Sequence, residues 1–286
     1  MKTVLVLTDF SQGSRVAAEV AIQMAAKLNA NILLFNSYKV MPLFPSVEVT
    51  TWTMQHYALL MQASKGNLNI EAERLNTLIA DLPADFRKPE LTCMSESGSL
   101  AENVRALVRA KDITMVVMGG RKEINANVVY GSDINAVLGK INCPTLIIPE
   151  TQTATDIKRI VFATDLTGSS LYAINWLTKF SVIYKILIHV RHVPKAVLAG
   201  DFDEEDDISE CMTAIGKLNS TNISFQYIRG NDVARELGTF NKITQEDILA
   251  IVHKKHSFIW RLFHANASEG LASHNKTPIL IIPESK

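Results

Sequence analysis

Two short polar segments in the first half of the chain combine residue types that can bind a phosphorylated ligand. Thr8-Asp9 ends one apolar run, and Gly119-Gly120-Arg121-Lys122 ends another. Adjacent glycines let backbone N–H groups approach a phosphate, and Gly131-Ser132 then opens a helical stretch, whose first N–H groups favour an anion. The carboxylate of Asp9 suits a ribose hydroxyl or the edge of a base. The competing interpretation is structural, because glycines after a strand often only permit a tight turn.

The elements that must position these residues alternate between strands and helices. In the first half, strands are expected at Thr3–Thr8, Asn31–Phe35, Leu91–Met94, Thr114–Met118 and Thr145–Ile148, and helices at Ser14–Leu28, Thr51–Ala80 (with a break near Gly66), Ser99–Ala110 and Ser132–Gly139. In the second half, strands are expected at Arg159–Ala163, Lys185–His189, Ile223–Tyr227, Ile248–Val252 and Ile279–Ile282, and helices at Ser169–Phe180, Asp203–Leu218, Asp232–Phe240 and Asn266–His274.

Continuous apolar strands separated by helices predict parallel βαβ units that are covered on both faces. Right-handed crossovers then give a doubly wound sheet, in which ligands bind at the carboxyl ends of the strands where the winding reverses. Both polar segments fall at such ends. Asn36, directly after the second strand, completes the set of candidate binding residues.

The chain repeats itself. Residues 144–150 read PTLIIPE and residues 278–284 read PILIIPE, 134 positions later, while Asp9 matches Asp165 at an offset of 156. We therefore predict two copies of one domain, at 1–150 and 158–286, joined by a polar linker at 151–157. The first copy is longer, and the extra residues are placed around 38–62, either as a lengthened helix or as a cover for a ligand or partner.

Composition excludes several classes of protein. The 286 residues are 47% hydrophobic and carry 29 basic and 29 acidic side chains, so that no net charge attracts nucleic acid or an anionic membrane. No uncharged apolar run reaches the roughly 20 residues of a membrane helix. Three widely spaced cysteines form no disulfide framework. The chain starts without a secretory signal, and we expect a cytoplasmic protein.

These features together resemble the universal stress protein family in a tandem two-domain form. The resemblance covers nearly the whole chain and rests on a strand that ends in Thr-Asp, a strand that ends in Met-Gly, a later Gly-Ser, and the final Pro-x-Leu-Ile-Ile-Pro. It implies five-stranded parallel α/β sheets with the order 3-2-1-4-5, like the adenine-nucleotide alpha-hydrolase fold. It also implies ATP or another adenine nucleotide as the ligand of the first half.

Both halves depart from the Gly-x-x-Gly, nine residues, Gly-Ser/Thr pattern of the family's ATP-binding members. In the first half Lys122 replaces the second glycine and the spacing is one residue short, although Arg121 and Lys122 supply positive charge. In the second half the equivalents of Gly119, Lys122, Gly131 and Ser132 are His253, His256, Ala265 and Asn266. We expect a degenerate nucleotide site in the first half and none in the second.

The resemblance implies a stress-response binding or signalling protein without catalytic residues or a metal. One alternative is a weak ATP-hydrolysing enzyme that uses Asp9, Lys122 and Ser132. Another is a metal or small-ligand sensor built on His253, His256, His264 and His274, the first pair of which has a spacing that zinc sites use.

The last strand of each copy would lie at the edge of its sheet as an exposed apolar strand, which favours pairing with another strand. We predict that Leu146–Ile148 and Leu280–Ile282 pair with each other, so that the chain is an internal pseudo-dimer; a further homodimer is left open.

Overall fold

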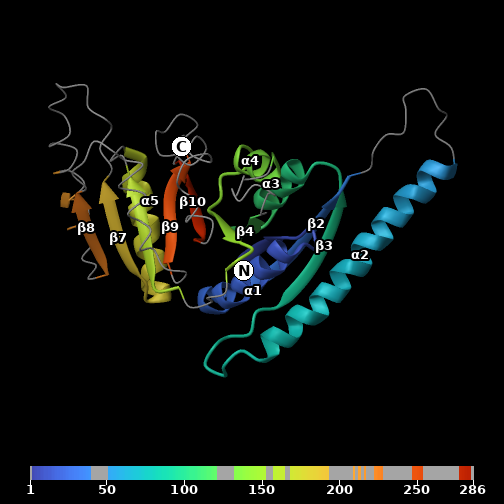
Figure 1. The fold of residues 1–286 in the computed structure, drawn as a ribbon, viewed down its shortest axis with the longest axis horizontal. Helices are drawn as coiled ribbons and strands as arrows, with labels where there is room; N and C mark the ends of the chain where they lie inside the picture. Colours follow the sequence, from blue (N-terminus) through green and yellow to red (C-terminus); the bar gives the residue numbers. More distant parts are fainter. Residues whose placement is uncertain are drawn as a thin grey trace. The chain divides into compact units, whose positions relative to one another are not determined.

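The computed structural model of the chain describes residues 2–39, 51–120, 132–152, 157–164, 168–192, 209, 212–213, 216, 222–227, 247–253 and 277–284. The chain has an α/β fold and divides into two compact units, which separate between Cys143 and Pro144 (Figure 1). Within these ranges no helix is both long and apolar enough to cross a membrane.

The first unit contains a parallel sheet and helices on both of its faces. Its elements are β1 (Thr3–Leu7), α1 (Gln12–Leu28), β2 (Asn31–Tyr38), α2 (Thr51–Ala80), β3 (Leu91–Ser97), α3 (Leu100–Ala110), β4 (Ile113–Gly120) and α4 (Ser132–Leu138). The strands follow the order β3-β2-β1-β4, and their described pairings are parallel. The long helix α2 lies alongside β3 (Figure 1).

Neighbouring side chains of β2 identify the helices on each face. Asn36 accepts a hydrogen bond from Ser64 of α2, whereas Ser37 accepts one from Asn103 of α3. Since successive residues of a strand point to opposite faces, α2 and α3 cover opposite sides of the sheet. Helix α1 contacts α2, and α4 contacts α3, so each face carries a pair of helices.

The central strands are buried on both faces, as their continuous apolar sequence predicts. Val4, Leu5 and Val6 of β1 are fully buried, and so are Val116 and Val117 of β4. A strand that is buried on both faces does not alternate between apolar and polar residues, which explains why these segments are apolar throughout.

The second unit shows the complete predicted winding. Its elements are β5 (Thr145–Pro149), β6 (Arg159–Thr164), α5 (Gly168–Tyr184), β7 (Leu187–His192), β8 (Ile223–Tyr227), β9 (Asp247–His253) and β10 (Ile279–Pro283). The order β8-β7-β6-β9-β10 is third, second, first, fourth and fifth, with parallel pairs, which confirms the fold class. The predicted helix Asp203–Leu218 falls mostly, and Asp232–Phe240 and Asn266–His274 fall entirely, outside the described residues.

Strand β5 pairs antiparallel with β10 in this unit. Ile147 lies opposite Ile279 and Leu146 opposite Leu280, and both leucines are fully buried. The final strands of the two halves therefore pair, as the sequence predicts, and each ends at its proline. Strand β5 belongs to the second compact unit, whereas the predicted repeat places it in the first domain. The domain limits 1–150 and 158–286 therefore describe the repeat in the sequence and stay a prediction.

Some element boundaries differ from those predicted. Strand β4 continues through Gly119 and Gly120, and α2 passes through Gly66 without a break. Strand β7 begins at Leu187 because Lys185 adopts a left-handed conformation (φ 54°) that ends α5. Asn29, its equivalent 156 positions earlier, ends α1 in the same way (φ 51°).

The longer connection of the first half lies between β2 and β3. Strands β1 and β2 match β6 and β7 at an offset of 156, whereas Leu91 of β3 corresponds to Ile223 of β8, an offset of 132. The extra residues therefore belong to the connection that contains α2, in agreement with the sequence.

The burial of Leu280, which lies opposite Leu146 of β5, can be tested by truncating its side chain. Truncating this fully buried side chain in Leu280→Ala should lower the free energy of unfolding by about 2–5 kcal/mol, measured by urea denaturation. Val182→Ala is the matched control, since Val182 of α5 is 64% exposed and its truncation should cost less than about 0.5 kcal/mol. Equal effects of the two substitutions would contradict the burial of Leu280.

Candidate functional site

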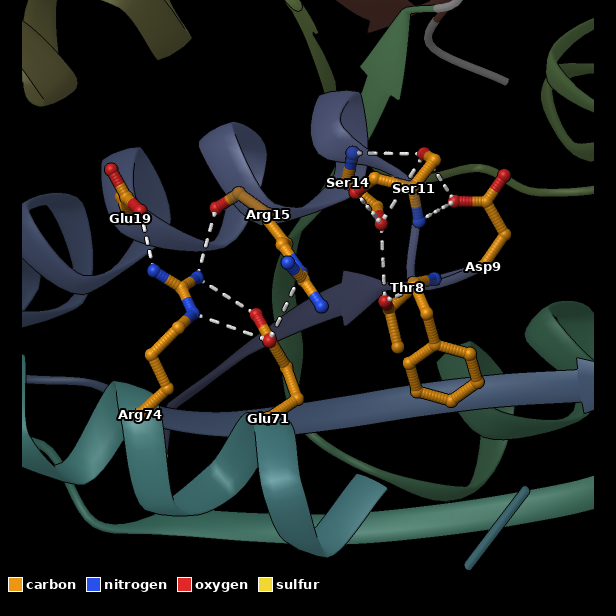
Figure 2. Close-up of polar contacts among 9 residues, drawn as sticks. Thr8, Asp9, Ser11, Ser14, Arg15, Glu19, Glu71 and Arg74 are labelled. Atoms are coloured by element: carbon orange, nitrogen blue, oxygen red, sulfur yellow. Dashed lines mark hydrogen bonds and ion pairs between the residues drawn. The ribbon is translucent and has the colours of Figure 1, made fainter. Parts of the chain in front are cut away.

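The turn after β1 is fixed by its own polar side chains (Figure 2). Phe10 has a left-handed backbone (φ 64°), which is costly for a residue other than glycine. Two hydrogen bonds support it: the Phe10 N–H donates to Thr8 Oγ1 at 3.0 Å, and the Ser11 N–H donates to Asp9 Oδ1 at 3.0 Å. The hydroxyl of Ser11 also donates to Asp9 Oδ1, at 2.5 Å. The Asp9 side chain is therefore exposed, and its two hydrogen bonds from Ser11 fix its orientation.

Helix α1 begins directly at this turn. Ser11 is the N-cap, and its hydroxyl accepts a hydrogen bond from the Ser14 N–H at 3.3 Å. The Ser14 hydroxyl donates to the Ser11 carbonyl at 2.9 Å and lies 3.2 Å from Thr8 Oγ1 (Figure 2). No acidic residue lies in the first turn of α1, so no carboxylate of the helix itself neutralises the partial positive charge at its N-terminus.

Asn36 connects three elements beneath the turn. It is buried, its amide nitrogen donates to the Thr8 carbonyl at 2.7 Å, and its amide oxygen accepts from Ser64 of α2 at 2.7 Å. Both functions of the side chain are therefore used inside the protein. The structure gives Asn36 a positioning role, and its expected contact with a ligand stays a prediction.

Position 119 requires a glycine because the first residues of α1 pack directly against its backbone. A Cβ atom at this position would lie 2.4 Å from the Gly13 carbonyl carbon and 2.6 Å from the Ser14 nitrogen. Both are backbone atoms, which cannot rotate away. The close approach of β4 to the start of α1 thus accounts for Gly119 without a ligand.

The structure brings part of the predicted site together. Strand β1 lies between β2 and β4, so Thr8, Asp9, Asn36, Gly119 and Gly120 gather at adjacent strand ends. Of the other predicted residues, Ser132 begins α4, but its side chain lies outside the description, as do Arg121, Lys122 and Gly131.

Sequence reasoning missed the partners that hold the turn, Ser14 and Ser64. One signal for Ser14 was present. Thr8 and Ser14 have the same spacing as Thr164 and Ser170, and the Thr164 hydroxyl donates to Ser170 Oγ at 2.6 Å in the second half. Nothing in the sequence marks Ser64.

The second half also replaces Asn36. His192, 156 positions later, is buried at the end of β7, and its Nδ1 lies 3.3 Å from the Thr164 carbonyl oxygen. Since a carbonyl only accepts, Nδ1 carries the proton in this contact. A different side chain therefore binds the equivalent backbone oxygen of the first strand.

An ion-pair network joins α1 to α2 beside the site (Figure 2). Glu71, buried on α2, accepts from Arg74 at 2.8 Å and lies 3.6 Å from Arg15 of α1. Arg74 also binds Glu19 of α1 at 2.5 Å. The hydrogen bond that Arg74 donates to Glu71 raises the pKa of Arg74 above its usual value.

No three His, Cys, Asp or Glu side chains converge as metal ligands in the described part of the chain. His253 ends β9, whereas His256, His264 and His274 lie outside the described residues.

The role of Asn36 predicts strong coupling with Ser64. Asn36→Ala leaves the Thr8 carbonyl and the Ser64 hydroxyl unpaired and should cost about 1–3 kcal/mol of stability, whereas Ser64→Ala should cost about 1 kcal/mol. In denaturant titrations the double variant should depart from additivity by at least about 0.5 kcal/mol. Strict additivity would show that the two side chains act independently.

The packing role of Gly119 predicts opposite effects at two glycines. Gly119→Ala should lower the free energy of unfolding by about 1–3 kcal/mol, because β4 and α1 must separate. Gly66→Ala, in the middle of α2 with nothing within 4 Å of its new Cβ, should raise stability by up to about 1 kcal/mol. Thermal unfolding of both variants distinguishes these signs, and a neutral Gly119→Ala would refute the packing role.

Comparisons with known proteins agree with this architecture. The family model described as "Universal stress protein family" matches residues 1–149. No curated protein matches the chain. Among solved structures, a universal stress protein from Archaeoglobus fulgidus DSM 4304 is 14% identical with a TM-score of 0.71, and the alignment covers 99% of this chain and 98% of that one.

A protein from Pseudomonas aeruginosa UCBPP-PA14 described as a putative universal stress protein is 12% identical, with a TM-score of 0.57 and coverage of 99% and 93%. At such low identities these structures establish the fold alone, and they do so over both halves of the chain. The match of the family model over residues 1–149 establishes the family: the chain belongs to the universal stress proteins.

Proposed function

We propose that this universal stress protein is a binding or signalling protein without enzymatic activity, and that its first half binds an adenine nucleotide at the carboxyl ends of β1 and β4. The observation that carries the proposal is the turn Thr8–Ser11 at this place. The winding of the sheet reverses between β1 and β4, where ligands of doubly wound sheets bind. The turn presents an oriented carboxylate beside a helix N-terminus.

The nucleotide is proposed to lie across these strand ends. Asp9 contacts a ribose hydroxyl or the base edge, because its Oδ1 is held by Ser11 and its side chain is exposed. The basic side chains of Arg121 and Lys122 and the Gly131-Ser132 segment are assigned to the phosphates from the sequence. The carboxylate of Asp133 in the first turn of α4 opposes a phosphate there, which favours weak binding.

For the second half we propose a structural role. His253 stands where the first half has Gly119, and a side chain there blocks close backbone approach to a phosphate. Strand β10 pairs with β5, which supports the proposal that the chain is an internal pseudo-dimer. A cytoplasmic location is part of the same proposal.

Calorimetry with ATP, with and without Mg²⁺, tests the nucleotide site. The wild-type chain should bind ATP, and Asp9→Asn should weaken binding about tenfold, since about one charged hydrogen bond is lost. Asparagine keeps Oδ1 as the acceptor for Ser11, so that the turn survives. Asp165→Asn, the equivalent substitution in the second half, is the control and should leave the affinity unchanged.

The absence of heat and of a thermal shift at millimolar ATP would refute the nucleotide site. Release of phosphate from ATP above background, lost in Asp9→Asn, would instead favour the enzyme.

A further inference from the structure

Two tyrosines meet at the same carboxyl edge of the first unit and have no part in the site described so far. Tyr38 is the last residue of β2, and Tyr57 lies in the second turn of α2. Their ring centroids are 6.1 Å apart and their planes are inclined by 55°. Tyr57 is 40% exposed.

The pair belongs to the same row of contacts as Asn36. Residues 36 and 38 of a strand point to one face, and Ser64 and Tyr57 are two helical turns apart on one side of α2. The contacts Asn36–Ser64 and Tyr38–Tyr57 therefore follow one another along β2. The first is buried and the second is open to solvent, about 6–7 Å further toward the carboxyl edge.

The hydroxyl groups of the pair are used within the protein. Tyr38 donates to the Tyr57 oxygen at 3.5 Å. The hydrogen bond to Tyr57 raises the pKa of Tyr38 to about 12, and hydrogen bonds from Tyr38 and Ser97 lower the pKa of Tyr57. The hydroxyl groups are therefore engaged within the protein, while Tyr57 keeps 40% of its surface exposed to solvent.

The end of β2, which carries Tyr38, neighbours the strand that carries Asp9. Neighbouring strands are about 4.8 Å apart, so the end of β2 lies one strand from Asp9 on β1. A ligand that holds its sugar at Asp9 and its phosphates toward β4 extends its base in the opposite direction, over the end of β2. Planar bases stack on exposed aromatic side chains.

The second half does not repeat Tyr38 in its sequence, because the equivalent position is Pro194. Tyr57 lies on α2, in the connection between β2 and β3 that is longer in the first half.

We propose that Tyr38 and Tyr57 form a stacking platform for the planar aromatic base of the bound ligand, which is adenine if the ligand is an adenine nucleotide. This inference rests on the proposed function of the first half, and it assigns to α2 the recognition of the base.

Calorimetry with ATP and variants of Tyr57 tests the platform. Tyr57→Leu removes the ring and should weaken ATP binding about five- to tenfold. Tyr57→Phe keeps the ring and should bind within about twofold of the wild-type chain. Tyr172→Leu is the matched control, because Tyr172 of α5 is 45% exposed and lies in the second unit; its affinity should be unchanged.

The outcomes separate the two proposals. If the wild-type chain binds no ATP, the proposed function fails and the platform fails with it. If ATP binds equally well to Tyr57→Leu, the platform is refuted while the nucleotide site stands. An equal loss in Tyr57→Phe and Tyr57→Leu would also refute stacking, because the hydroxyl rather than the ring would then matter. Thermal unfolding without ligand checks that each variant is folded, and Tyr38→Leu replaces Tyr57→Leu if the latter is not.

Discussion

The buried amide of Asn36 is the interaction on which the first unit depends. It is one side chain with a donor and an acceptor, and it satisfies the Thr8 carbonyl of β1 and the Ser64 hydroxyl of α2 from its place on β2. A buried amide that loses either partner is costly, so the turn after β1 and the helix α2 cannot move independently. The ion pairs of Arg74 with Glu19 and of Arg15 with Glu71 are a second link between α1 and α2. The turn after β1 and the tyrosine pair are therefore linked through β2 and α2.

The second unit keeps this constraint but changes the chemistry. The hydroxyl pair Thr164–Ser170 repeats Thr8–Ser14, and His192 binds the first-strand carbonyl that Asn36 binds in the first half. An imidazole with a protonated Nδ1 offers the same arrangement as an amide, one donor and one acceptor in the ring plane. Both halves therefore supply a hydrogen-bond donor to the backbone carbonyl at the end of their first strand, but from different side chains.

Periodicity and repeated segments were enough to predict the fold. The central strands are buried on both faces, so their apolar runs stood out, and the repeated Leu-Ile-Ile fixed the pairing of β5 with β10. Strand ends are harder to predict, because Asn36, Ser37 and Tyr38 are polar residues that extend β2 by pairing with β3. The sequence predicts the kind of site but not the role of each residue. It indicates Asp9 as a ligand contact, whereas the hydrogen bond between Asp9 and Ser11 depends on the left-handed backbone of Phe10.

Gly119 shows why a motif glycine is weak evidence for a ligand. The backbone of Gly13 and Ser14 excludes any side chain at this position, whether or not a phosphate binds nearby. A family member without a ligand would keep this glycine as long as its first helix approached β4 as closely. The second half has His253 at the equivalent position, where a side chain would prevent an approach as close as that of α1 to β4. Exposed residues outside the core are better indicators. Tyr57 is one of these, because 40% of its surface is exposed.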